Sequence, residues 1–317
     1  MLTGVTVSLV LLGYVIVLAL ELSRLYIRLP WRAPVVIMLA SICWLLHAVY
    51  LWNLLIAARL SATGVNQLSG SLLAQGMYTT LFSWSLLAAL ILALAYILLA
   101  VRRPTNAIGS FLLPLVLGMI LGAVAVRSGQ PFDRSEVDGA LWRPVHGGAL
   151  IVGTVALFLG FAAALMNLLQ EYRLKTKRPL TKEWRLPSLE YLHTMGRSCL
   201  VVSTIAIAMG LVSGVVLNIQ RNGSINWLES GIVFCAGLLI WLIVASVLEW
   251  EAARRGTSWS AYLNIASFAI VLIALILVFS TPHGRSPIDT VGKTTSSIES
   301  HAETFIARNS AVGRSLQ

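Results

Sequence analysis

Eight apolar runs, each long enough to cross a lipid bilayer, constrain the fold of this 317-residue chain more than any other feature. About 20 consecutive apolar residues span the hydrocarbon core of a bilayer as an α-helix. The connections between the runs are short and leave no room for a large soluble domain. The runs cover roughly residues 3–23, 35–58, 77–101, 108–126, 147–169, 196–217, 230–250 and 260–281. We therefore predict an all-α fold, a polytopic membrane helix bundle with about eight transmembrane helices.

The composition agrees with this class of protein. Hydrophobic residues make up 57% of the chain and charged residues only 11%, and the mean hydropathy is +0.82. A soluble domain has about 25% charged residues, more than twice this fraction. The arginines that follow the first run, with no basic segment before it, predict a retained helix rather than a cleaved signal peptide.

Basic residues are concentrated in alternate connections. Thirteen lie on one predicted side of the membrane: Arg24, Arg28, Arg32, Arg102, Arg103, Arg173, Lys175, Lys177, Arg178, Lys182, Arg185, Arg254 and Arg255. The loops between the runs on the other side hold five: Arg59, Arg127, Arg134, Arg143 and Arg221. Lys and Arg are enriched in cytoplasmic loops. We therefore predict an inner (plasma) membrane protein with both termini outside, whose net charge of +10 orients it and requires no nucleic-acid partner.

The chain is expected to contain three segments. Residues 1–107 hold the first three spans, residues 108–283 hold the other five, and residues 284–317 form a polar, weakly ordered tail outside the membrane. Ser188 follows a proline and precedes Glu190, a pattern typical of a helix N-cap with an acidic first turn. The sixth helix is therefore predicted to begin as an interfacial segment before it enters the membrane.

Two of the five histidines mark candidate ligand positions on the outer face. His146 opens the fifth span, and His283 follows the eighth. Two imidazoles at one membrane surface are suited to the axial ligation of haem iron. Arg143 and Arg285 stand beside them and can pair with the anionic propionates of a porphyrin. The alternative is that the histidines are interfacial residues and the arginines bind lipid phosphate.

Ionisable residues within the spans allow two interpretations each. His47, near the middle of the second span, is either a neutral imidazole bonded to a neighbouring helix or a haem ligand within the bilayer. Glu249, near the cytoplasmic end of the seventh span, either pairs with Arg254 or Arg255, which we favour, or is a buried carboxylate. His193 and His301 have no chemical neighbourhood in the sequence.

Motifs of self-contained enzymes are absent from the sequence. It has no H-E-x-x-H, no P-loop, no carboxylate cluster for a divalent metal, and no G-x-S-x-G in a strand–turn–helix setting. Several glycines of the fifth span permit close approach of another helix or of a flat ligand, helix packing being the commoner cause. They are Gly147, Gly148, Gly153 and Gly160. We predict a binding protein and no enzyme.

Five motifs resemble the integral-membrane cytochrome c assembly superfamily of the CcsA/CcmC type, and most closely its HemX-like/YpjD-like branch. They are L-L-H-A-V-Y at residues 45–50, V-H-G-G-A-L-I-V-G at 145–153, L-L-Q-E-Y-R-L-K-T-K at 168–177, L-P-S-L-E-Y-L-H-T-M-G-R-S at 186–198 and A-M-G-L-V-S-G at 208–214. The family's W-G-x-x-W-x-W-D-P loop is absent, and N-G-S-I-N-W-L-E at residues 222–229 keeps only Trp227 and Glu229. Glu249 stands where the cytochrome-assembling members carry a histidine. Both departures favour the HemX-like branch.

The resemblance implies a haem-binding or haem-handling protein of cytochrome c biogenesis. By it His146 and His283 are the two outward-facing haem ligands, His47 matches the histidine of the second helix in the HemX-like branch, and Trp227 remains from the haem-presenting loop. Implied partners are haem, other cytochrome c assembly proteins or apocytochrome c. The alternative is a HemX-like regulator that acts on a tetrapyrrole-pathway enzyme through its cytoplasmic loop, about residues 170–195. A transporter is a third possibility, but no matched broken helices are present in the two halves.

Overall fold

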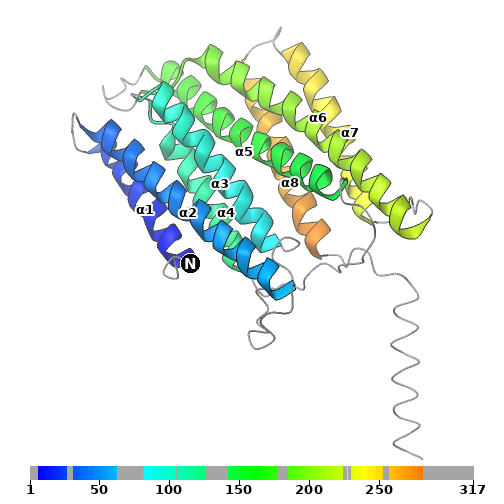
Figure 1. Cartoon of the computed structure of the whole chain (residues 1–317). Helices are drawn as coiled ribbons and strands as arrows, with labels where there is room; N and C mark the ends of the chain where they lie inside the picture. Colours follow the sequence, from blue (N-terminus) through cyan, green and yellow to red (C-terminus); the bar gives the residue numbers. More distant parts are fainter. Residues whose placement is uncertain are drawn as a thin grey trace, which may run out of the picture. The chain divides into compact units, whose positions relative to one another are not determined.

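The computed structural model describes residues 6–26, 31–62, 81–104, 106–125, 142–177, 185–223, 227, 230–252 and 257–280. These residues form eight α-helices (Figure 1): α1 Val7–Leu22, α2 Arg32–Ala62, α3 Leu81–Arg102, α4 Gly109–Ala125, α5 Trp142–Lys175, α6 Leu189–Asn222, α7 Ser230–Ala252 and α8 Thr257–Ser280. A short 3-10 helix, Ser23–Leu25, follows α1. The described ranges contain no strand, only one isolated bridge between Asn106 and Arg185. The predicted all-α class is confirmed, with one helix at each apolar run.

Five of the described helices contain segments long and apolar enough to cross a membrane: Arg32–Ile56, Phe82–Arg102, Pro144–Lys175, Leu189–Gln220 and Ile232–Glu251. The shorter apolar helices are Val7–Leu22, Gly109–Ala125 and Trp259–Ala274. Large apolar side chains such as Ile205 on α6 and Val247 on α7 are exposed on the outside of the bundle. An apolar surface of this kind is stable against lipid and unfavourable in water.

Helix α5 is the central helix of the unit formed by residues 1–278. Of its most apolar stretch 67% is buried, against 22% to 33% for the other four long helices. Figure 1 shows α5 between α1–α4 and α6–α8. Phe268 of α8 stacks on Phe161 of α5 with ring centroids 4.1 Å apart, and Phe158 meets the same ring edge-on at 4.8 Å. Residues on α5 are therefore close to both groups of helices.

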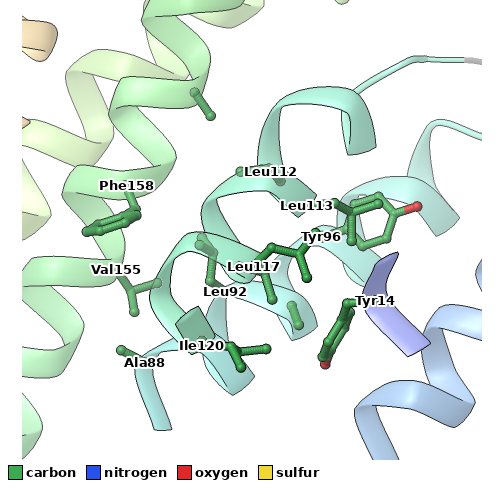
Figure 2. Close-up of a cluster of buried hydrophobic side chains, with 14 of the residues drawn as sticks. Tyr14, Ala88, Leu92, Tyr96, Leu112, Leu113, Leu117, Ile120, Val155 and Phe158 are labelled. Carbon is green, nitrogen blue, oxygen red and sulfur yellow. The ribbon is translucent and has the colours of Figure 1, made fainter. Parts of the chain in front are cut away.

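Two clusters of buried apolar side chains hold the helices together. The larger lies among α1–α5 and reaches the start of α6; Figure 2 shows its part around Tyr14, Leu92, Leu113, Ile120 and Phe158. The smaller joins α5–α8 through Leu157, Leu200, Ile207, Leu238, Leu242 and Val271. Since lipid is as apolar as these side chains, close packing and polar contacts stabilise such a bundle more than removal of water does.

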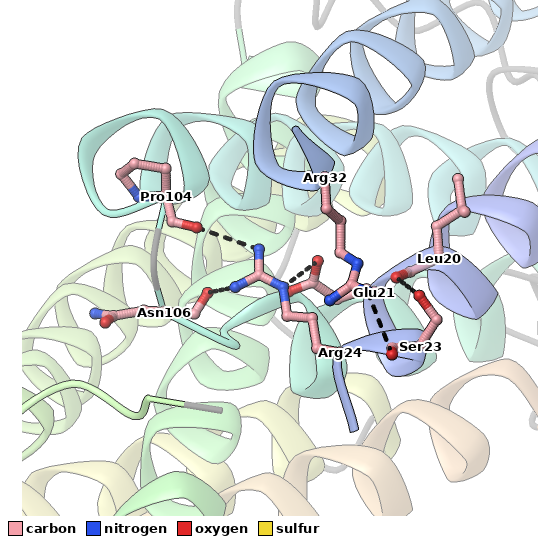
Figure 3. Close-up of polar contacts among 7 residues, drawn as sticks. All are labelled: Leu20, Glu21, Ser23, Arg24, Arg32, Pro104 and Asn106. Atoms are coloured by element: carbon pink, nitrogen blue, oxygen red, sulfur yellow. Dashed lines mark hydrogen bonds and ion pairs between the residues drawn. The ribbon is translucent and has the colours of Figure 1, made fainter. Parts of the chain in front are cut away.

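Several basic residues meet at one end of the bundle, here called the basic end (Arg24, Arg32, Arg103 and Arg185). Arg24 Nε lies 3.3 Å from Glu21 Oε2, and its guanidinium donates to the carbonyls of Pro104 and Asn106 at 3.2 and 3.4 Å (Figure 3). Arg32 donates to the carbonyl of Ser23 at 3.4 Å. Ala107 N donates to Arg185 O at 2.9 Å, and Arg103 lies 3.8 Å above the Tyr191 ring. The α1–α2, α3–α4 and α5–α6 connections therefore lie at the same end.

The start of α6 agrees with the predicted N-cap. Ser188 Oγ accepts a hydrogen bond from Tyr191 N at 3.4 Å, and Glu190 lies in the first turn. The helix ends at Gly223, which adopts the left-handed conformation (φ 69°) and donates its N–H to Ile219 O. With 34 residues, α6 is about 51 Å long, whereas the hydrocarbon core of a bilayer is about 30 Å thick. It is long enough to extend beyond the membrane.

Candidate functional site

His146 lies on the first turns of α5, where it packs against the second half of α6. Its Nδ1 is 2.7 Å from Gly210 O. A carbonyl oxygen can only accept, so Nδ1 carries the proton and donates it to this bond. In the neutral imidazole the other nitrogen, Nε2, therefore carries the lone pair. Nε2 makes no hydrogen bond with the described residues.

Small residues of α6 make room for this ring. A Cβ atom at Gly214 would lie 2.9 Å from His146 Cε1 and 3.1 Å from Nδ1, too close for any side chain. Ser213 Oγ has two possible carbonyl acceptors, Met209 O at 2.7 Å and Gly210 O at 3.0 Å, and lies 3.5 Å from His146 Nδ1. The A-M-G-L-V-S-G segment of α6 and the V-H-G-G segment of α5 are thus parts of one site.

The start of α5 also packs against α3. A Cβ atom at Gly147 would overlap the indole of Trp84, so this glycine permits close packing of α3 and α5. Gly153 meets Ile207 and Ala206 of α6 in the same way. No described atom lies within 4 Å of the Cβ position of Gly148, which is exposed. Helix packing accounts for Gly147 and Gly153, while the surface at Gly148 stays open.

The geometry of His146 is compatible with an axial haem ligand. Histidines that bind a metal usually donate the other ring N–H to a carboxylate or a backbone carbonyl, which fixes the tautomer and the ring orientation. His146 makes this bond with Gly210 O. Within the described residues, no group of three or more His, Cys, Asp or Glu side chains could hold a metal ion by itself. His146 therefore offers one ligand here, not a complete metal site.

The other residues predicted for the outer face are placed only in part. His283, Arg285 and the side chain of Arg143 lie outside the described residues. Trp227 lies between α6 and α7 and is 66% exposed. The structure thus joins His146 to α6 and leaves its relation to His283 a prediction.

His47 is enclosed by protein in the middle of α2. Its side chain is fully buried, and Nδ1 lies 3.5 Å from the Tyr14 hydroxyl of α1. The two rings meet edge to face with centroids 5.9 Å apart. Nε2 has no hydrogen-bond partner among the described residues. The interpretation as an imidazole bonded to a neighbouring helix fits these contacts, and Nε2 keeps a free lone pair or proton.

Histidine 193 was expected to have no chemical neighbourhood, and this expectation is wrong. His193 Nε2 of α6 lies 3.5 Å from Glu249 Oε1 of α7, and Ser260 of α8 donates to the same oxygen. Glu249 is fully buried, as in the second interpretation given for it, while Arg254 and Arg255 lie outside the described residues. The carboxylate stands between the imidazole and the hydroxyl, whereas in a nucleophilic triad the imidazole occupies the middle. Ser260 is therefore not an activated nucleophile.

A polar stripe on α8 could have revealed this cluster in the sequence. Ser260, Asn264 and Ser267 recur at positions i, i+4 and i+7 of an apolar helix and are all buried. In lipid, such a stripe must face other helices. Trp241 Nε1 of α7 donates to Ser267 at 3.0 Å, and Asn264 occupies the space left by Gly160 and Gly196. This stripe, together with Glu249 in the neighbouring span, is the pattern in the sequence that indicates a buried polar cluster.

Comparison with protein-family models, with curated proteins and with solved structures finds no match to this chain.

Proposed function

We propose that this protein binds haem at the outer face of the inner (plasma) membrane and handles it in cytochrome c biogenesis. His146 and His283 would ligate the haem iron, and Arg143 and Arg285 would pair with the propionates. The bond from His146 Nδ1 to Gly210 O supports this proposal most directly, because it directs the lone pair to Nε2. The resemblance of the motifs to the CcsA/CcmC-type superfamily, HemX-like/YpjD-like branch, gives the class of ligand.

The proposal includes eight transmembrane helices with both termini outside. The contacts among the α1–α2, α3–α4 and α5–α6 connections support it, since these connections carry most of the basic residues and meet at one end. Exposed aromatic side chains at helix ends near that side, such as Trp31, Trp250 and Trp259, fit a membrane–water interface. The start of α5, with His146, then lies at the outer end.

Haem binding is tested by purifying the protein in detergent from haem-replete cells and recording its Soret spectrum. We expect haem in the wild type, and loss of most of it in His146→Ala and in His283→Ala, because each removes one axial ligand. His301→Ala is the matched control and should retain haem. A wild type without haem, or Soret spectra that both substitutions leave unchanged, would contradict the proposal.

The biological role is tested in a deletion strain. Loss of c-type cytochromes with normal total haem supports a role in cytochrome assembly. Changed levels of an early tetrapyrrole-pathway enzyme, with cytochrome c formation intact, would instead support the regulatory alternative and overturn the assembly role.

A further inference from the structure

A second ionisable site lies among α6, α7 and α8 and is separate from the residues proposed to bind haem. It contains the carboxyl group of Glu249, the imidazole of His193 and the hydroxyl of Ser260. Glu249 comes at the end of α7, while His193 and Ser260 come at the starts of their helices. Because Arg103 of the α3–α4 connection contacts Tyr191 at the start of α6, this site lies toward the basic end.

The two oxygens of Glu249 have different surroundings. Oε1 accepts from the Ser260 hydroxyl and lies 3.5 Å from His193 Nε2. Oε2 is buried and has no hydrogen-bond partner among the described residues. A buried carboxylate oxygen without a donor is costly, and a proton on the carboxyl group removes its charge. Oε2 is therefore a buried acceptor position that no described residue fills.

The side chains of His193 and Glu249 differ in exposure, and this difference suggests where a proton enters the pair. The side chain of Glu249 is 1% exposed and that of His193 is 17% exposed. The imidazole therefore reaches the surface of the bundle, whereas the described protein covers the carboxyl group. A neutral imidazole has one nitrogen that accepts a proton and one that donates a proton, which suits it as a relay.

Other charged groups at this end have their own partners. Arg197, one turn after His193 on α6, lies 4.3 Å above the Trp250 ring. Lys175 of α5 pairs with Glu171 at 2.7 Å, and Arg173 of α5 and Glu251 of α7 have further contacts. On α8, Ser260 and Asn264 face inward and carry no charge, while Tyr262 is exposed. Among the described residues, His193 is thus the titratable group recorded against Glu249.

We propose that Glu249 is a proton-binding carboxyl group that is loaded from the basic end of the bundle through His193. The proton moves from His193 Nε2 to the carboxylate, so imidazolium and carboxylate become imidazole and carboxylic acid. The total charge of the pair does not change. Ser260 stays bonded in both states, since its hydroxyl donates to a carboxylate and can accept from a carboxylic acid. Asn264 lies one turn further along α8. Its Oδ1 is buried and has no hydrogen-bond partner among the described residues.

Infrared difference spectroscopy of the purified full-length protein through a pH series tests this proposal. A protonated carboxyl group has a C=O stretching band that a carboxylate lacks. We expect such a band in the wild type, its loss in Glu249→Gln and its retention in Glu190→Gln, the matched control with an exposed acid on α6. If Glu249→Gln does not fold, Glu249→Asp serves for assignment, because a different acid shifts the band.

A pH jump then tests the route. Removal of a positioned proton-transfer group costs a factor of about 100 or more in rate. In His193→Gln we therefore expect the carboxyl band to form about 100-fold more slowly, an effect that a purely structural histidine would not produce. Absence of a band that depends on Glu249, or an unchanged rate in His193→Gln, overturns the proposal. Neither result affects the haem proposal, which uses different histidines.

Discussion

The ring of His146 is fixed by backbone and glycine contacts rather than by another ionisable side chain. The Gly210 carbonyl holds Nδ1 at 2.7 Å, and the missing side chain at Gly214 leaves the space that the ring fills. A histidine at a helix end is ordinarily free to rotate toward water. Here the protein itself sets both the tautomer and the orientation, which would reduce the free energy lost on ordering the ring if a ligand binds.

Substitution of Gly214 tests this arrangement at the scale of one residue. In Gly214→Ala the new Cβ would lie 2.9 Å from His146 Cε1, so the ring must shift from the Gly210 carbonyl. Overpacking of this kind costs about 1–3 kcal/mol. We expect lower haem occupancy and a lower thermal midpoint in detergent.

The matched control is Gly118→Ala on α4, where no described atom lies within 4 Å of the Cβ position. This variant should keep both haem and stability. Equal behaviour of the two variants would show that Gly214 does not position His146.

At the scale of the element, α6 connects the two candidate sites. Its first turns carry His193, and its second half carries Gly210 and Gly214. Partly buried hydrogen bonds such as that between Thr204 Oγ1 and Ser246 Oγ, at 3.0 Å, link its middle to α7. A change at the start of α6 is therefore expected to affect the packing of His193 against Glu249 before it affects the contacts of His146.

Ser188→Ala should destabilise the start of α6. The substitution removes the hydroxyl that accepts from Tyr191 N, and loss of an N-cap costs about 1 kcal/mol. We expect a lower thermal midpoint for the purified protein. Ser198→Ala, at an exposed position within the same helix, is the control and should have little effect. An unchanged midpoint in Ser188→Ala would mean that tertiary contacts alone hold this end of the helix.

For the whole molecule, the charge pattern and the contacts between the basic connections predict that the basic end faces the cytoplasm. Cysteines introduced singly into a background without Cys43, Cys199 and Cys235 can be labelled with a membrane-impermeant maleimide. We expect Gln220→Cys, at an exposed position near the end of α6, to react on intact spheroplasts. Thr176→Cys, just after α5, should react only after the membrane is permeabilised. The reverse pattern would place His146 on the cytoplasmic side and contradict the proposed outer haem site.

Much of the fold could be predicted from the sequence. Apolar runs of about 20 residues predicted each α-helix that the described residues form, because hydrogen bonding within the helix satisfies the backbone wherever water is absent. The N-cap at Ser188 was also predicted, since a cap depends on neighbours only three residues apart. The neighbourhood of His193 was not, because Glu249 is 56 positions away in the chain and meets it only through the packing of α6 and α7.

The sequence by itself therefore determined the helices, their order and the alternation of basic connections, since these depend on local polarity and run length. Only the tertiary structure decided which side chains meet. It placed His146 against Gly210, enclosed His47 beside Tyr14 and buried Glu249 between Ser260 and His193. In an apolar bundle these contacts depend on the rotation of each helix about its axis. That rotation is set by small residues and by a few polar groups that must avoid lipid.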